Sequence, residues 1–237
     1  MSIDLDSFRT QAREWLAEHA PGHEVAPNEQ GHLLTEEQFQ RWQAWHRTKA
    51  EGGWAGLHWP EHAGGRGLSR QHAVLYELEE QAYTVPRGEY LNVGHQFAAP
   101  TILAFGSEET QRRLLPRILD GSEYWCQLFS EPAAGSDLAG IRTRAVRDRE
   151  TGGDWIVNGQ KVWTTYAQWA KWAILVTRTD PEVPKHKGLT YFWIDMTSPG
   201  VEVRPIRKID GDVHFNEVFL TNVRVPDAQR LGAVGEG

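Results

Sequence analysis

The chain has 237 residues, enough to bury a sizeable core as one large domain or two ordinary ones. Its hydrophobic fraction of 40% and charged fraction of 24% exclude a chain too polar to fold, and a single cysteine excludes an internal disulfide or a multi-thiolate zinc site. The net charge of -7 disfavours binding to nucleic acid, which needs a basic face. The acidic amino terminus and the lack of a long apolar run predict a cytoplasmic protein without membrane insertion.

Residues 1–122 are predicted to form an all-α domain, because apolar side chains recur there at helical spacing. On the first helix, expected to end near Pro21, the stripe consists of Leu5, Phe8, Ala12, Trp15 and Leu16. Thr35 and Gln38 fit a capping box, in which each side chain satisfies the other residue's free amide. A second helix is expected to follow, with an inward face made by Phe39, Trp42, His46 and Lys49.

Three further helices are predicted beyond a glycine-rich loop at residues 54–68. Ser69 is expected to cap the first of them, whose inward face would be Val74, Leu75, Leu78 and Ala82. Residues 91–105 are expected to be helical with a break at Pro100, and another helix begins at Ser107 and runs to about residue 120.

From residue 123 to residue 230 the apolar period changes to two, which predicts an antiparallel all-β domain. Asn158-Gly159, placed between two short apolar runs, predicts a hairpin with a type I′ turn. No helix-length crossover separates the candidate strands, so antiparallel pairing is expected. The other candidates are residues 142–148, 172–178, 189–196, 201–207 and 214–225.

Two apparent motifs do not carry a site. His58 to His62 has the spacing of an inverted zinc-peptidase motif, but Pro60 prevents the helix on which both histidines would share a face. Gly64 to Gly67 lacks the preceding strand of a phosphate-binding loop and is expected to be a connector. The charged residues 142–150 are read as a solvated strand face.

Two segments could line a ligand. Small residues after Ser130 let the backbone approach a ligand closely, and the hydroxyls of Ser130 and Ser136 could hold a polar or anionic group; a simple tight turn fits the same residues. Trp163, with Thr164 and Thr165, offers an aromatic plane and two hydroxyls, although Trp163 could equally pack in the core.

Residues 127–137 and 159–165 resemble the two signature segments of the acyl-CoA dehydrogenase family, (T/S)-E-P-x-A-G-S-D and N-G-x-K-x-W-(I/T)-(T/S), in the family's order and spacing. Residues 59–68, 99–109 and 214–226 are also similar to the family, so the resemblance covers essentially the whole chain.

The resemblance implies an α+β organisation and a bound FAD. The helical domain at residues 1–122 and the β domain at 123–230 would be followed by a linker at 231–237, while the family's C-terminal four-helix bundle is absent from this chain. Ser136 would also approach the acyl-CoA substrate, and Ser130 replaces the commoner threonine while keeping the hydroxyl. The residues expected to contact FAD are Gln127, Leu128, Phe129, Ser130, Ser136, Trp163, Thr164 and Thr165.

The activity implied is α,β-dehydrogenation of an acyl-CoA thioester to the 2-enoyl-CoA, as in β-oxidation and lipid catabolism. Electrons would pass to an electron-transfer flavoprotein, and the protein would be a homo- or hetero-oligomer. Ala133 and Tyr166 depart from the family pattern, at positions that affect loop shape and acyl-pocket depth.

The family's catalytic glutamate is expected beyond residue 237, so no catalytic residue is named. The chain is therefore expected to be a truncated form that is inactive alone and binds FAD weakly. Two alternatives stay open: an acyl-CoA oxidase or related flavin monooxygenase, and a non-catalytic partner subunit.

Overall fold

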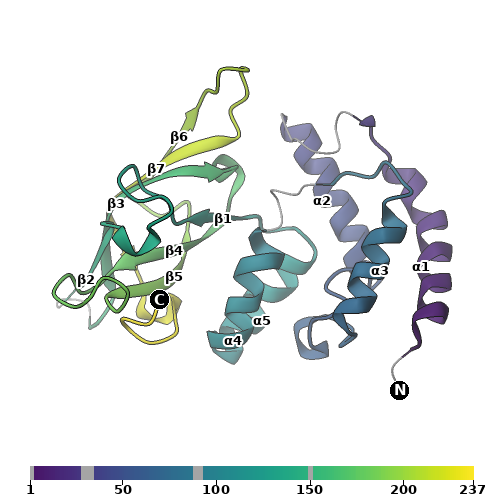
Figure 1. The fold of residues 1–237 in the computed structure, drawn as a ribbon, viewed down its shortest axis with the longest axis horizontal. Helices are drawn as coiled ribbons and strands as arrows, with labels where there is room; N and C mark the ends of the chain where they lie inside the picture. The colour runs from purple at the N-terminus through teal and green to yellow at the C-terminus, as the bar shows by residue number, and fades with distance from the viewer. Residues whose placement is uncertain (1–2, 28–34, 88–92, 149–151) are drawn as a thin grey trace. The chain divides into compact units, whose positions relative to one another are not determined.

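The computed structural model describes residues 3–27, 35–87, 93–148 and 152–237, which divide into a helical unit and a sheet unit (Figure 1). The helical unit comprises Met1–His95 and Glu108–Ser122, and the sheet unit comprises Gln96–Ser107 and Glu123–Gly237. The segment 96–107 thus belongs with the sheet. The domain boundaries drawn from the sequence stay predictions.

The described part of the helical unit contains the α-helices α1 (Leu5–His19), α2 (Glu36–Glu51), α3 (Arg70–Glu80) and α5 (Glu108–Leu119). Short 3-10 turns lie at Ala20–His23 and Glu61–Ala63. The predicted capping box is confirmed, because the Thr35 amide donates to Gln38 Oε1 at 3.1 Å and the Gln38 amide donates to Thr35 Oγ1 at 3.2 Å. The predicted stripe of α1 is also confirmed at its centre, where Phe8, Ala12 and Leu16 are buried.

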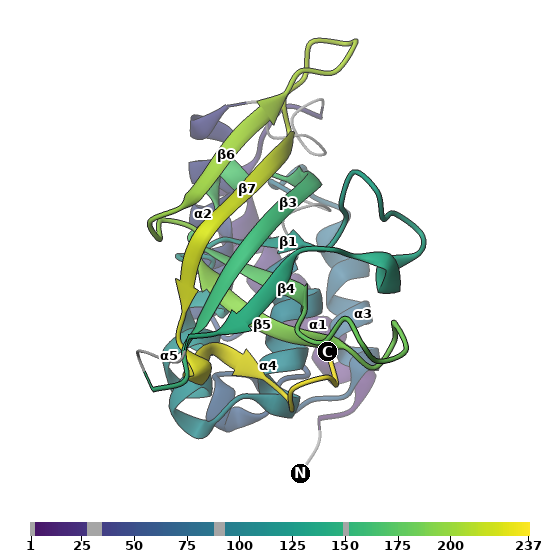
Figure 2. The same ribbon diagram turned by 90° about the vertical axis from the view of Figure 1, so that its left-hand side faces the viewer.

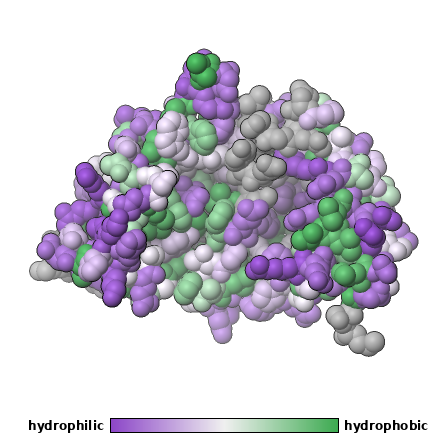
Figure 3. All heavy atoms as spheres, in the orientation of Figure 1, coloured by the Kyte–Doolittle hydropathy of each residue, from purple (hydrophilic) through white to green (hydrophobic). Residues whose placement is uncertain are grey.

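Helix α3 turns a different face inward from the one predicted. Val74 and Leu78 are each 53% exposed, whereas His72, Tyr76 and Glu80 are buried. The buried face is chosen by its partners: the Tyr76 ring stacks on Trp54, and the Glu80 carboxylate accepts a hydrogen bond from Trp45 Nε1 at 2.9 Å. Apolar side chains are consequently left on the surface around α1 and α3 (Figure 3).

The start of α3 also differs in detail from the prediction. Ser69 occupies the cap position, but its hydroxyl makes no capping bond and lies 2.8 Å from His72 Nδ1.

The helical segment does not break at Pro100 as predicted. A π-helical turn at Gly94–Ala98 leads directly into α4 (Ala99–Phe105), and the joining residue Ala98 has a helical backbone. The hydrogen-bond pattern changes from π to α just before Pro100, which has no N–H to donate. Residues 91 and 92 of the predicted helix lie outside the described residues.

One sheet of eight strands is described in the sheet unit (Figure 2). Seven strands run in the order β6-β7-β3-β2-β4-β5-β8, and β1 pairs with β4 off that path. The strands are β1 (Trp125–Leu128), β2 (Arg144–Arg147), β3 (Trp155–Thr165), β4 (Trp172–Arg178), β5 (Leu189–Asp195), β6 (Val201–Ile206), β7 (Phe215–Val225) and β8 (Arg230–Leu231). The predicted fold class, helices followed by an antiparallel sheet, is confirmed.

Strand β1 is an exception to antiparallel pairing, because it runs parallel to β4, with Leu128 opposite Leu175. Strand β2 also meets β4 in parallel, at one residue pair. The expectation was wrong here because a crossover need not be a helix. The antiparallel strand β3 carries the chain back, so β4 starts in the same direction as β1 and β2.

The hairpin predicted at Asn158-Gly159 does not form. Strand β3 runs unbroken through both residues, and its antiparallel partners are β2 and β7. Gly159 serves close packing instead, since a Cβ there would lie 2.3 Å from Thr143 Oγ1. Asn158 binds Asn222, whose φ of 50° marks the extra residue of a bulge in β7.

Candidate functional site

The two segments that could line a ligand are joined in the fold. The Val162 amide of β3 donates to the carbonyl of Ser130, just beyond β1, at 3.0 Å. This bond brings Phe129 and Ser130 together with the end of β3 that carries Trp163. Ser136 lies further along the loop with an exposed side chain, and among the described residues no hydrogen bond joins it to β3.

Trp163 occupies a β-bulge that turns its side chain outward. Lys161 pairs with Val218 and Thr164 with Asn216, so β3 has one residue more than β7 over this interval. Trp163 takes up the extra residue with a φ of 59°, in the left-handed region that costs a non-glycine residue about 1–2 kcal/mol. Its indole is 57% exposed and is braced edge-on by Phe215 at 5.7 Å.

Exposure and backbone strain together indicate a binding surface at Trp163. A large aromatic side chain that is mostly in water contributes little to folding, and backbone strain of this kind is concentrated at functional sites. The core packing left open by the sequence is therefore excluded for Trp163.

The other residues predicted to contact a cofactor differ in how far they are exposed to a ligand. Leu128 is fully buried, so neither its side chain nor its backbone is exposed to a ligand. Gln127, Phe129, Ser130 and Thr165 are partly exposed. Thr164 is 1% exposed, and its Oγ1 has no hydrogen-bond partner among the described residues.

A buried ion pair that the sequence reasoning missed lies beneath these segments. Lys161 Nζ lies 2.8 Å from Glu131 Oε1, with side-chain exposures of 0% and 5%. The ammonium also donates to the carbonyls of Phe129 at 3.0 Å and Val176 at 2.9 Å, so all three of its protons have acceptors. The available signal was a lysine inside the apolar run of a predicted strand, because such a residue is rarely buried without a partner.

The Glu131 carboxylate is fully engaged. It accepts the amides of Arg142 at 2.6 Å and Thr143 at 2.9 Å as well as the Lys161 ammonium. Burial raises its pKa, but the charge and hydrogen bond of Lys161 with the two neighbouring donors outweigh that effect and hold the pKa below the ordinary value. Burial lowers the pKa of Lys161 to about 8, against the opposing effect of Glu131. Glu131 is therefore a structural anion and a poor proton acceptor.

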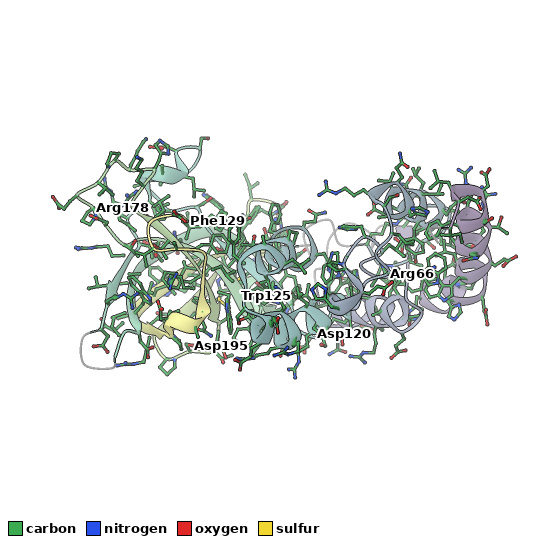
Figure 4. The ribbon with its side chains drawn as sticks, turned by 90° about the horizontal axis from the view of Figure 1, so that it is seen from below. Arg66, Asp120, Trp125, Phe129, Arg178 and Asp195 are labelled. Atoms are coloured by element: carbon green, nitrogen blue, oxygen red, sulfur yellow. The ribbon has the colours of Figure 1, made fainter. Side chains whose placement is uncertain are left out.

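A cavity of about 380 Å³ is lined in part by residues 139–142, the end of the loop that begins at Glu131. Its lining includes Arg142, Arg144, Arg178 and Lys185. Arg178, which is labelled in Figure 4 together with Phe129, holds the cavity wall together, because its guanidinium donates to the carbonyls of Ala139, Ile141 and Lys185.

Two arginines of this cavity have exposed side chains. Arg142 lies just before β2 and Arg144 is its first residue, and both are exposed while the intervening Thr143 is buried. Lys185 is bound to Asp137 at 2.7 Å. The segment read from the sequence as a solvated face thus supplies two cations to a cavity that can attract an anion.

Other site types lack support among the described residues. No group of three or more His, Cys, Asp or Glu residues is arranged there to hold a metal ion. Within the same residues, no helix has the length and apolar character needed to cross a membrane.

The chain matches two family models. Residues 3–122 match the acyl-CoA dehydrogenase N-terminal domain, and residues 126–223 match the acyl-CoA dehydrogenase middle domain. The acyl-CoA dehydrogenase IpdE1 of Mycobacterium tuberculosis is 42% identical over 235 residues, which are 99% of this chain and 60% of that protein.

Two solved structures also align with almost the whole of this chain. A variant of the Tcur3481-Tcur3483 steroid ACAD aligns with a TM-score of 0.83 and 31% identity, covering 98% of this chain and 59% of the other. A glutaryl-CoA dehydrogenase from Mycobacterium smegmatis in complex with FADH2 aligns with a TM-score of 0.69 and 26% identity, covering 98% and 57%. The chain thus spans about 60% of the length of the relative IpdE1. With both family models matched over most of its length, the chain belongs to the acyl-CoA dehydrogenase family.

Proposed function

We propose that this chain provides the flavin-contacting surface of an FAD-dependent acyl-CoA dehydrogenase. The observation that carries the proposal is Trp163, whose exposed indole stands on a strained bulge directly beside Ser130. An isoalloxazine ring needs a flat apolar surface with hydrogen-bond donors at its edge, and this surface combines an indole with backbone amides and hydroxyls. The relative with bound FADH2 supports the same cofactor.

The residues divide into those that meet the ring and those that hold it in place. We assign the indole of Trp163 to a face of the isoalloxazine. Ser130, Thr164 and Thr165 are assigned to its polar edge, together with the backbone of Gln127 and Phe129. The Oγ1 of Thr164 fits such a role, because it is buried and has no partner within the described part of the chain, which is costly unless a ligand satisfies it.

The reaction proposed is α,β-dehydrogenation of an acyl-CoA thioester, with electrons passed on to an electron-transfer flavoprotein. The flavin, when bound, supplies the acceptor for the hydride that leaves the β carbon. The described residues contribute binding, orientation and exclusion of water. Glu131 is excluded as the general base because its carboxylate is occupied by Lys161 and two amides, and we assign no base among the described residues.

We place the nucleotide end of the CoA thioester at the basic cavity. Its phosphates carry several negative charges, and Arg142 and Arg144 present guanidinium groups suited to phosphate. Ser136, on the loop that links this cavity to the flavin surface, is assigned to the substrate as well as to the cofactor. The name of the Tcur3481-Tcur3483 relative points to steroid-linked acyl groups as the first class to test and to a complex of two different chains.

Absorbance spectroscopy of the purified gene product tests the proposal. The protein is supplied with FAD, freed of excess cofactor and titrated without oxygen with straight-chain, branched and steroid-linked acyl-CoA thioesters. Bleaching of the flavin bands by one class would support dehydrogenation and name that class. Rapid reoxidation by air would favour an oxidase, and a protein that retains no flavin would refute the proposal.

A further inference from the structure

The Lys161 ammonium connects three separate pieces of backbone inside the sheet unit. Its acceptors are the carbonyl of Phe129 after β1, the carboxylate of Glu131 in the next loop and the carbonyl of Val176 in β4. Glu131 extends the connection to the amides of Arg142 and Thr143 before β2. One buried charge pair thus joins the segments around the proposed flavin surface.

Stability alone does not account for a charge pair in this position. Desolvation of two ions offsets most of their attraction, and replacing a buried ion pair by apolar residues of similar size is often neutral or stabilising. Apolar side chains, however, cannot form directional hydrogen bonds. An ammonium with three acceptors fixes the separation of the three groups it binds.

The pair stands at the place where β3 leaves its regular ladder. Lys161 is the last residue paired with β7 before the bulge, and pairing resumes at Thr164. Val162, the next residue, donates to the carbonyl of Ser130, so two consecutive residues of β3 are bound to the segment after β1 immediately before Trp163. Movement of Lys161 would alter the bulge and the distance between Trp163 and Ser130.

We propose that Lys161 and Glu131 are positioning residues, which hold the Trp163 bulge and the Ser130 backbone in the separation that a flavin ring requires. The inference rests on the proposed flavin function and adds two residues that do not themselves touch the cofactor.

A neutral double variant separates positioning from stability. Lys161→Met or Glu131→Gln alone leaves a buried charge without its partner, so each single variant is expected to melt well below the wild type. The variant that combines the two substitutions carries neither charge, and its melting temperature is expected to recover in large part. Its affinity for FAD is nonetheless expected to fall by roughly tenfold or more, because Trp163 and Ser130 are no longer held at the separation that fits the flavin ring.

A second measurement does not depend on flavin. The FAD-free protein is labelled with 5-fluorotryptophan, and the ¹⁹F line of Trp163 is assigned by its loss in Trp163→Phe. That line is expected to shift or broaden in the double variant. Lys161→Arg, which keeps the charge but changes the contacts, is expected to fold and to move the same line, so the test survives if the double variant does not fold.

The matched control is Lys171→Met with Asp195→Asn, which removes a partly exposed ion pair of 2.7 Å in the same unit. It is expected to leave both FAD affinity and the Trp163 line unchanged. An unaltered Trp163 line in the Lys161 variants would overturn the inference, as would wild-type FAD affinity in the folded double variant. A wild-type protein that binds no FAD would refute the proposed function instead, and the ¹⁹F line would still decide whether Lys161 positions Trp163.

Discussion

Glu131 and Lys161 form a 2.8 Å ion pair in the interior of the sheet unit, although they are 30 residues apart in the sequence. Each belongs to a different one of the two signature segments. The pair therefore joins the two segments in the fold: one supplies the buried cation, and the other supplies the anion and a carbonyl that satisfy it.

The backbone strain at Trp163 predicts a trade-off between stability and binding. Trp163→Gly is expected to keep or slightly raise the melting temperature, because relief of about 1–2 kcal/mol of left-handed strain offsets the lost contact with Phe215. FAD affinity is expected to fall at the same time. Thermal melting and flavin titration check both effects, with Trp163→Ala as the control that removes the indole but keeps the strain. Unchanged FAD affinity would show that Trp163 is not part of the flavin surface.

Gly159 is expected to be intolerant of a side chain. An added Cβ would lie 2.3 Å from Thr143 Oγ1 and 2.7 Å from Thr143 Cα, so Gly159→Ala is expected to lower the free energy of unfolding by about 1–3 kcal/mol. Gly135→Ala is the control, because its Cβ would meet nothing within 4 Å. Denaturant titration measures both. Equal stability of the two variants would contradict the close packing of β3 against Thr143.

Two histidines, His46, which is buried, and His95, which is partly buried, are expected to make the helical unit sensitive to acid. Burial, aided by the charge of Lys49, lowers the pKa of His95 to about 4 and holds that of His46 well below its usual value. Below the unfolded pKa of 6.5 the unfolded chain gains protons that the folded chain does not, so stability falls as the pH falls from 6.5 towards 4.

The expected loss of unfolding free energy is about 1 kcal/mol for each of the two imidazoles between pH 6.5 and 5.5. Unfolding curves across this range measure it. His95→Gln should reduce the slope, while His186→Gln, at an exposed position, should leave it as in the wild type. A wild-type stability that does not change over this interval would contradict the prediction.

The basic cavity predicts an electrostatic contribution to CoA binding. Arg142→Gln combined with Arg144→Gln is expected to weaken binding of free CoA by roughly tenfold at low salt, and by less at high salt, because exposed charges are screened. Calorimetric titration at two salt concentrations checks this. Arg204→Gln, on β6 outside the cavity and paired with Glu202, is the control. Equal CoA affinity in the double variant and the wild type would remove the cavity from the substrate site.

Local chemistry was enough to predict much of the fold. The capping box at Thr35 and Gln38 depends on residues three apart, and the apolar run predicted as a strand at residues 172–178 matches β4 at both ends. The signature segments likewise placed Trp163 and Ser130 at the candidate site. Such features depend on neighbours in the chain, so they can be read from its order.

Other features were settled only by contacts between distant residues. Two stripes of α3 compete at helical spacing, and the one containing Tyr76 is buried because Trp54 and Trp45 lie against it. Asn158-Gly159 has the composition of a turn, yet Thr143 and Asn222 hold it inside a strand. The partnership of Lys161 with Glu131 is of the same kind. Composition and spacing show which contacts a residue is able to make. Which of these contacts buries it in the folded protein depends on residues that are distant in the sequence and are brought near only by folding.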